Sequence, residues 1–137
     1  MNQKTLDLIE TARSLVHKVR LREGTAGSVG AAIRTAQGNV YTGVCVDLSS
    51  GLGFCAEVAA VAQMLTHGET QIVAAVAVNG NGVLPPCGRC RETMAQLDER
   101  NLDCEVILGE GRSVSLRELL PDHWLAESGE EGAVSGP

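Results

Sequence analysis

Four residues in two short motifs have the types and the spacing of a hydrolytic metal site. Cys55 and Glu57 belong to the sequence Phe-Cys-Ala-Glu, and Cys87 and Cys90 belong to Pro-Cys-Gly-Arg-Cys-Arg. Zinc binds thiolates, and a catalytic zinc site keeps three protein ligands and leaves the fourth position to water. The three cysteines can fill the three protein positions, and Glu57 is a spare carboxylate beside them. The pattern therefore predicts one catalytic zinc ion.

Each motif opens a segment with helical composition, which favours thiolates at these positions. Cys87 and Cys90 are three residues apart on the first turn of a helix, so both thiols point the same way. Cys55 begins the other helix, and a helix N-terminus lowers the pKa of a thiol through its partial positive charge and free N–H groups. If Cys55 lies half outside its helix, Glu57 can reach a metal-bound water, whose pKa zinc lowers to roughly 7. We therefore expect Glu57 to move protons without binding the metal.

Other interpretations of these residues stay open. A structural zinc site needs four protein ligands, and the fourth would come from Cys45, Cys104 or His67. A Cys-x-x-Cys redox pair would account for only two of the three cysteines. Glu57 could also be an exposed carboxylate that the helix dipole favours.

The composition limits the class of protein. The chain has 137 residues, enough for one domain, and is 44% hydrophobic but only 2% aromatic. Its formal net charge of −6 argues against a nucleic-acid partner, which requires a basic face. No apolar run approaches the roughly twenty residues of a membrane span, and the N-terminus does not resemble a signal peptide. We therefore expect a cytoplasmic protein whose cysteines bind metal or remain free thiols.

Hydrophobic periodicity and turn residues define the elements that must position the two motifs. The expected helices are Thr5–Val19, Cys55–His67 and Cys87–Asn101. The expected strands are Ser28–Thr35, Val40–Val46, Gln71–Val78 and Cys104–Leu108, with Asn79–Pro86 as a loop. Ser113–Leu120 is expected to begin as a strand or turn and to end in a short helix.

This order of elements predicts one α/β domain over residues 1–126, a three-layer αβα sandwich with mixed strand directions. The acidic, Gly/Ser-rich residues 127–137 are expected to form a disordered tail. The segment Cys55–His67 is apolar nearly all the way round, which is typical of a helix buried on every side. Either the sheet and other helices of one monomer bury it, or a partner subunit covers part of it.

The two motifs together resemble those of the cytidine deaminase family, and the likeness runs from the first predicted helix to Leu120-Pro121. The resemblance implies a mixed five-stranded sheet, one zinc ion per subunit and a homo-oligomer, a tetramer rather than a dimer. It also implies hydrolytic conversion of the 4-amino group of a cytosine-type ring to a carbonyl, with release of ammonia. In that reaction Glu57 takes the water's proton and gives it to the ring nitrogen, hydroxide attacks C4, and Glu57 then gives a second proton to the amino group that leaves as ammonia. The Ala56 N–H holds the base carbonyl.

The match to the family is weakest in the substrate pocket. Nucleoside-specific relatives carry Asn-x-Glu where this chain has Cys45-Val46-Asp47, and Cys45 is a poor hydrogen-bond partner. The resemblance places Ser28, Cys45, Asp47 and Trp124 at the substrate, although Trp124 is equally open to subunit packing. Arg91 is the expected counter-charge for the three thiolates, ahead of Arg89.

Three functions follow from these features. The first is deamination of cytidine, deoxycytidine or an analogue. The second is deamination of an aminopyrimidine nucleoside antibiotic, because Ser28 and the Gly-Arg of the second motif are similar to the blasticidin S deaminase branch. The third, from another class, is a non-catalytic zinc-binding module that uses the fold for assembly.

Overall fold

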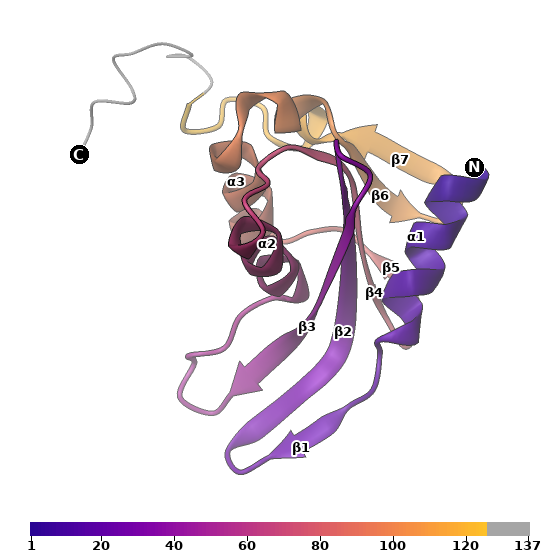
Figure 1. Cartoon of the computed structure of the whole chain (residues 1–137). Helices are drawn as coiled ribbons and strands as arrows, with labels where there is room; N and C mark the ends of the chain where they lie inside the picture. The colour runs from indigo at the N-terminus through magenta and orange to yellow at the C-terminus, as the bar shows by residue number, and fades with distance from the viewer. Residues whose placement is uncertain (126–137) are drawn as a thin grey trace.

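A mixed seven-stranded β-sheet forms the centre of residues 1–125, the residues that the computed structural model describes (Figure 1). The strand order is β1-β2-β4-β6-β7, with β3 paired to β2 and β5 paired to β4. Strands β4 and β6 are parallel, and the other strand pairs of residues 1–125 are antiparallel. The strands are β1 (Val19–Leu21), β2 (Gly24–Thr35), β3 (Val40–Leu48), β4 (Ile72–Asn79), β5 (Gly82–Leu84), β6 (Glu105–Gly109) and β7 (Arg112–Ser115).

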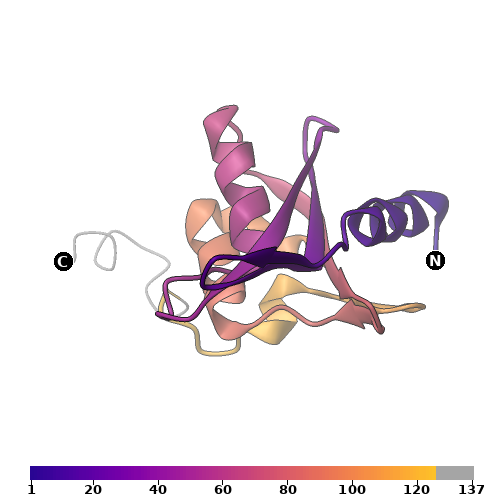
Figure 2. The ribbon, with the colours of Figure 1, turned by 90° about the horizontal axis from the view of Figure 1, so that it is seen from below.

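The helices cover both faces of this sheet, which confirms the predicted three-layer sandwich. Helix α1 lies on one face, and α2 and α3 lie side by side on the other (Figure 2). The helices are α1 (Gln3–Ser14), α2 (Ala56–Thr66) and α3 (Gly88–Leu97), with the 3₁₀-helices η1 (Glu99–Asp103) and η2 (Leu116–Leu119). No helix within residues 1–125 has the length and apolar composition needed to cross a bilayer.

Strand β4 is buried on both faces, which explains its continuous apolar run. On one side it packs with α1, in a cluster that includes Leu8, Ile9, Ala12, Ala74, Val76 and Val78. On the other side it packs with α2 and α3, in a cluster that includes Ala60, Met64, Ala75, Met94 and Val106. The cluster at α1 is wholly aliphatic, and the cluster at α2 and α3 adds methionine and cysteine side chains and one aromatic residue, Tyr41.

The prediction of five strands was wrong, because the sheet has seven. The additional strands β1 and β5 are three residues long, too short to show an apolar period, and β5 lies inside the predicted loop Asn79–Pro86. The first helix also ends earlier than predicted, at Ser14 rather than Val19. The His17 N–H donates to the Gly27 carbonyl over 2.9 Å, which draws the chain onto the edge of β2.

The third predicted helix, Cys87–Asn101, is divided in two. Helix α3 ends at Leu97, and the Asp98 carboxylate accepts the Arg100 N–H at 3.0 Å, which begins η1. A polar side chain that caps a new helix competes with continuation of the old one. The predicted domain boundary at 126 and the predicted tail 127–137 lie outside the described residues.

Candidate active site

The N-termini of α2 and α3 carry the three cysteines of the two motifs. Cys55 is the N-cap residue of α2 and Cys87 is the N-cap residue of α3, and both have extended backbone angles. Neither side chain makes a capping hydrogen bond, unlike the Ser, Thr, Asp or Asn usual at this position. Their sulfur atoms are therefore not committed to the helices that they begin.

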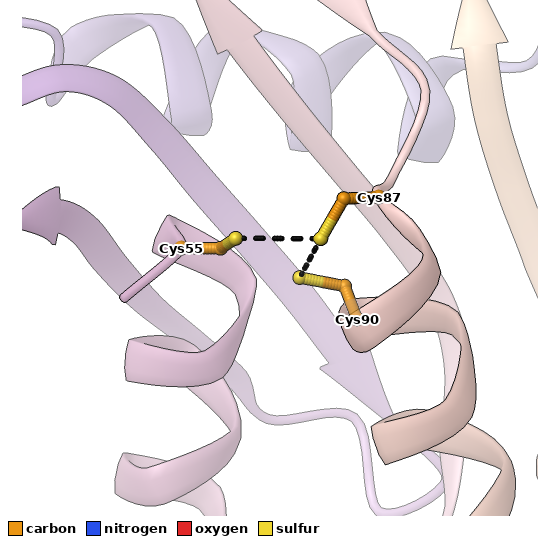
Figure 3. A group of neighbouring side chains, drawn as sticks. All are labelled: Cys55, Cys87 and Cys90. Carbon is orange, nitrogen blue, oxygen red and sulfur yellow. Dashed lines mark hydrogen bonds between the residues drawn. The ribbon is translucent and has the colours of Figure 1, made fainter. Parts of the chain in front are cut away.

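The three sulfur atoms converge between the two helix ends (Figure 3). The Sγ atoms of Cys55 and Cys87 are 3.4 Å apart, and those of Cys87 and Cys90 are 3.6 Å apart. Zinc–sulfur bonds of about 2.3 Å in a tetrahedral site place sulfur atoms about 3.8 Å apart. The separations and the all-sulfur donor set therefore fit a zinc ion, with all ligand atoms within 4.8 Å of one another.

No fourth side chain of residues 1–125 joins this group of three cysteines. Cys104 is buried in the core between the sheet and α3, and His67 lies at the other end of α2, with its ring against Tyr41. Cys45 instead contacts Ser28 and Asp47. The predicted candidates for a fourth ligand of a structural zinc site thus lie apart from the three sulfurs.

Glu57 lies in the first turn of α2 with its side chain turned inward, and the residue is only 6% exposed. Burial raises the pKa of this carboxyl, although hydrogen bonds from its own backbone N–H and from Cys90 act in the opposite direction. A raised pKa makes a carboxylate a stronger base, as a group that accepts a proton from water requires. It is not the solvent-exposed residue of the alternative interpretation.

The thiols have unequal proton affinities. Burial raises the pKa of Cys55 and of Cys90, and the charge of Glu57 raises that of Cys90 further. Burial also acts upward on the pKa of Cys87, but the Cys90 backbone N–H and the neighbouring thiols outweigh it, so the pKa is lowered. Cys87 is thus the thiol whose pKa is lowered, and zinc binding requires all three thiols to lose their protons.

A pocket of about 530 Å³ is lined by Cys55, Cys87 and Glu57. Four of the residues predicted at the substrate line it, namely Ser28, Cys45, Asp47 and Ala56. Trp124 is not among the lining residues: its side chain is 62% exposed and its backbone N–H donates to Glu92 on α3. The β2–β3 pair and the start of α2 thus form the pocket.

Further lining residues include Phe54, Leu84, Pro85 and Arg89, which were not predicted to line the pocket. Phe54 and Arg89 could have been suspected because they stand inside the two motifs. Leu84 and Pro85 reach the pocket because β5 pairs with β4, and that strand has no signal in the sequence.

A chain of polar contacts crosses the pocket wall. Ser28 Oγ lies 3.3 Å from Cys45 Sγ, and the Cys45 thiol donates to Asp47 Oδ2 over 3.6 Å. Asp47 forms no ion pair with a lysine or arginine of residues 1–125. The Asp47 carboxylate can therefore accept hydrogen bonds from a ligand. The Cys45 thiol already contacts its two neighbours, Ser28 and Asp47.

Arg91 lies behind the second motif rather than in the pocket. Its Nε donates to the Pro86 carbonyl over 2.9 Å, and its Nη1 donates to the Leu119 carbonyl over 3.3 Å. These contacts hold the guanidinium beside the residue that precedes Cys87. Arg89 instead lines the pocket.

Comparison with known proteins agrees with this geometry. Residues 2–105 match the family model described as the cytidine and deoxycytidylate deaminase zinc-binding region. The chain is 39% identical over 97 residues to a cytidine deaminase of Mycobacterium tuberculosis, covering 69% of this chain and 71% of that protein. It is 29% identical over 134 residues to a blasticidin-S deaminase of Bacillus cereus, covering 88% and 92% of the two chains.

Solved structures agree as well. A crystal structure of the Mycobacterium tuberculosis cytidine deaminase superposes with a TM-score of 0.75 at 30% identity, covering 90% of this chain and 98% of that chain. The family match spans both motifs, and the cysteines in those motifs form the group that fits zinc. The chain therefore belongs to the cytidine deaminase family of zinc-dependent hydrolases.

Proposed function

We propose that this protein is a nucleoside deaminase, which hydrolyses the 4-amino group of cytidine or deoxycytidine with release of ammonia. The observation that carries the proposal is the buried Glu57 carboxyl, which lines a pocket together with Cys55 and Cys87, two of the three converging cysteines. Cys55, Cys87 and Cys90 are the proposed zinc ligands. Zinc bound there supplies Lewis-acid activation of water at neutral pH.

The side chains around that position have distinct proposed roles. Glu57 takes one proton from the attacking water and delivers it to the ring nitrogen, then takes the second proton from the hydroxyl added at C4 and delivers it to the amino group, which leaves as ammonia. The Ala56 N–H, one of the free donors of the first α2 turn, holds the carbonyl oxygen of the base. Arg91 offsets the excess negative charge of three thiolates, since its Nε donates to the carbonyl of Pro86, the residue before Cys87.

Asp47 is the proposed contact for the sugar. An ionised carboxylate only accepts hydrogen bonds, so it favours hydroxyl groups and repels a phosphate. No lysine or arginine of residues 1–125 forms an ion pair with Asp47, so its carboxylate keeps this preference, although Arg89 also lines the pocket. The part of the substrate at Asp47 is therefore proposed to be a sugar hydroxyl group.

A second candidate is an aminopyrimidine nucleoside antibiotic such as blasticidin S. It is supported by the relative of that name, which matches most of both chains, and by the absence of an amide side chain at Cys45. Asp47 would suit a cationic substituent on the sugar. Ammonia release from cytidine, deoxycytidine, cytosine, deoxycytidylate and blasticidin S, measured side by side, separates these substrates.

Replacement of Glu57 tests whether the protein is an enzyme or a zinc-binding assembly module. We expect Glu57→Ala to retain zinc and the fold while turnover falls by at least about 10²- to 10⁴-fold, the usual contribution of general acid–base catalysis. Zinc content by elemental analysis and circular dichroism are the controls. Unchanged ammonia release from a folded, zinc-loaded variant would rule out the proposed role of Glu57.

We also propose a cytoplasmic homo-oligomer, a tetramer rather than a dimer. Three thiolate ligands need a compartment that keeps cysteines reduced. Apolar side chains on and before α2 remain uncovered in the single chain, with Leu52 77%, Phe54 38% and Leu65 43% exposed. A second subunit would bury such a surface.

A further inference from the structure

Gly43, in the middle of β3, faces the first turns of α2 at very short range. A Cβ atom added at Gly43 would lie 2.6 Å from the Ala59 Cβ, 2.6 Å from the Ala60 nitrogen and 2.7 Å from the Ala56 oxygen. Two of these three atoms belong to the backbone of α2, so a change of side-chain rotamer cannot relieve the overlap. A side chain at position 43 and the present position of α2 therefore exclude each other.

The clash falls on the part of α2 that carries the chemistry. In an α-helix the N–H of residue 60 donates to the carbonyl of residue 56. The added Cβ would therefore overlap both atoms of this hydrogen bond, which lies in the first turns of α2 beside Cys55 and Glu57. Ala56 and Ala60 are fully buried and cannot move toward solvent without opening the core. An added methyl group would instead push the start of α2 away from β3.

We propose that Gly43 is a positioning residue for the zinc site. The missing side chain lets α2 lie directly on β3, and this contact sets the position of Cys55 relative to the two cysteines of α3. The inference rests on the proposed zinc site. It assigns a function to a residue that touches neither metal nor substrate.

The test compares glycine-to-alanine variants of the full-length protein. We expect Gly43→Ala to bind zinc about 10- to 100-fold more weakly in chelator competition, the range seen when groups that orient metal ligands are lost. With cobalt(II) as the probe, the visible absorption bands should shift, because one thiolate no longer sits at its normal distance. Both readouts are independent of the substrate.

Two other glycines serve as matched controls. Gly30 in β2 meets a similar obstacle, since an added Cβ would lie 2.5 Å from the Ala12 oxygen, but that atom belongs to α1. Gly30→Ala should therefore destabilise the fold and leave zinc affinity and the cobalt spectrum unchanged. An added Cβ at Gly109 would meet no atom within 4 Å apart from those of its chain neighbours. Gly109→Ala should therefore change neither the stability of the fold nor the binding of zinc and cobalt.

A second variant covers the case in which Gly43→Ala does not fold. Ala59→Val adds methyl groups on the helix side of the same contact and should shift the cobalt spectrum in the same direction, by less. Normal zinc affinity and a normal cobalt spectrum in a folded Gly43→Ala, or in Ala59→Val if the former is unfolded, would overturn the inference. Equal losses of zinc affinity in Gly30→Ala and Gly43→Ala would also overturn the inference. Failure of the unaltered protein to bind zinc would instead refute the proposed function.

Discussion

At the scale of single residues, two cysteines occupy positions where helices usually begin with an oxygen-bearing side chain. Cys55 and Cys87 leave the first N–H groups of α2 and α3 without a side-chain cap. An N-cap oxygen is worth about 1 kcal/mol to a helix, so each helix gives up some local stability. A bound zinc ion would compensate by joining the two helices through their first residues.

Removal of one thiol should therefore affect both metal binding and folding. We expect Cys87→Ala to lose stoichiometric zinc and to unfold at a lower temperature, because metal binding to a folded site contributes to folding free energy. Elemental analysis and a thermal melt measure the two effects. Cys104→Ala is the matched control: it removes a buried thiol, 3% exposed, from the core and should lower stability while zinc remains. Full zinc occupancy in Cys87→Ala would contradict the ligand assignment.

The contact between Asp47 and the sugar can be tested by removing the charge. We expect Asp47→Asn to lower kcat/KM for a nucleoside by about tenfold to a hundredfold, since a hydrogen bond to a charged group contributes roughly 1.5–3 kcal/mol. Activity on the free base cytosine, which has no sugar, is the internal control and should not change. An equal loss on both substrates would show that Asp47 does not act through the sugar.

At the scale of elements, the junction between α3 and η1 depends on one ionised carboxylate. Asp98 accepts hydrogen bonds from the Arg100 backbone and guanidinium and from Thr70. The Arg100 side chain is the main cause that holds the pKa of Asp98 well below its usual range. The carboxylate also joins this junction to the loop before β4, through Thr70.

This junction should make stability dependent on pH in the acid range. Since the pKa is lower in the folded protein than the value of about 3.9 in the unfolded chain, the stabilisation is complete above that value and lost as the pH falls further. We expect Asp98→Asn to be less stable than the unaltered protein at pH 7 in urea unfolding. The difference in unfolding free energy between the two proteins should shrink below about pH 4.

Asp103→Asn provides the comparison, because Asp103 pairs with Arg117 while both side chains are largely exposed, at 74% and 60%. An exposed ion pair of this kind contributes little to folding stability. Asp103→Asn should therefore show no pH-dependent difference in stability from the unaltered protein. Acid also weakens zinc binding, but it does so in every variant. A gap for Asp98→Asn that stays constant down to pH 3 would refute the assigned role of its charge.

At the scale of the whole molecule, the sheet places a catalytic layer on one face and a supporting layer on the other. The proposed zinc ligands lie at the N-terminal ends of α2 and α3, and α1 packs across the sheet from these two helices (Figure 2). The outer surface of α2 remains partly apolar, with Leu65 43% exposed. The single chain therefore has an uncovered apolar surface on this helix.

Sedimentation at micromolar concentration should show an oligomer. We expect Leu65→Glu to shift the equilibrium toward monomer, because a charge cannot be buried in an apolar interface without a large cost. Leu6→Glu on α1 is the matched control, since Leu6 is 44% exposed on the opposite face of the sheet, and it should leave the oligomer intact. A monomer for the unaltered protein, or dissociation by Leu6→Glu alone, would count against an interface on α2.

The sequence by itself determined the residue types of the site and the local elements that carry them. Cysteines next to helix starts, a carboxylate two residues into a helix and a doubly buried strand are all signals that extend over a few residues. Such signals reflect the backbone preferences of the residues and the spacing of apolar residues, both of which can be recognised within a short stretch of sequence. They were enough to place the two motifs at the starts of α2 and α3.

Only the tertiary structure decided how these pieces meet. The contact of Ser28 with Cys45 depends on the register of β2 and β3, and that of Gly43 with α2 depends on how closely a helix packs on the sheet. Strand β5 exists because β4 offers it a hydrogen-bonding partner, so it brings Leu84 to the pocket without any local pattern. These contacts join residues far apart in sequence, and packing of the whole domain, rather than the preference of any segment, fixes their distances.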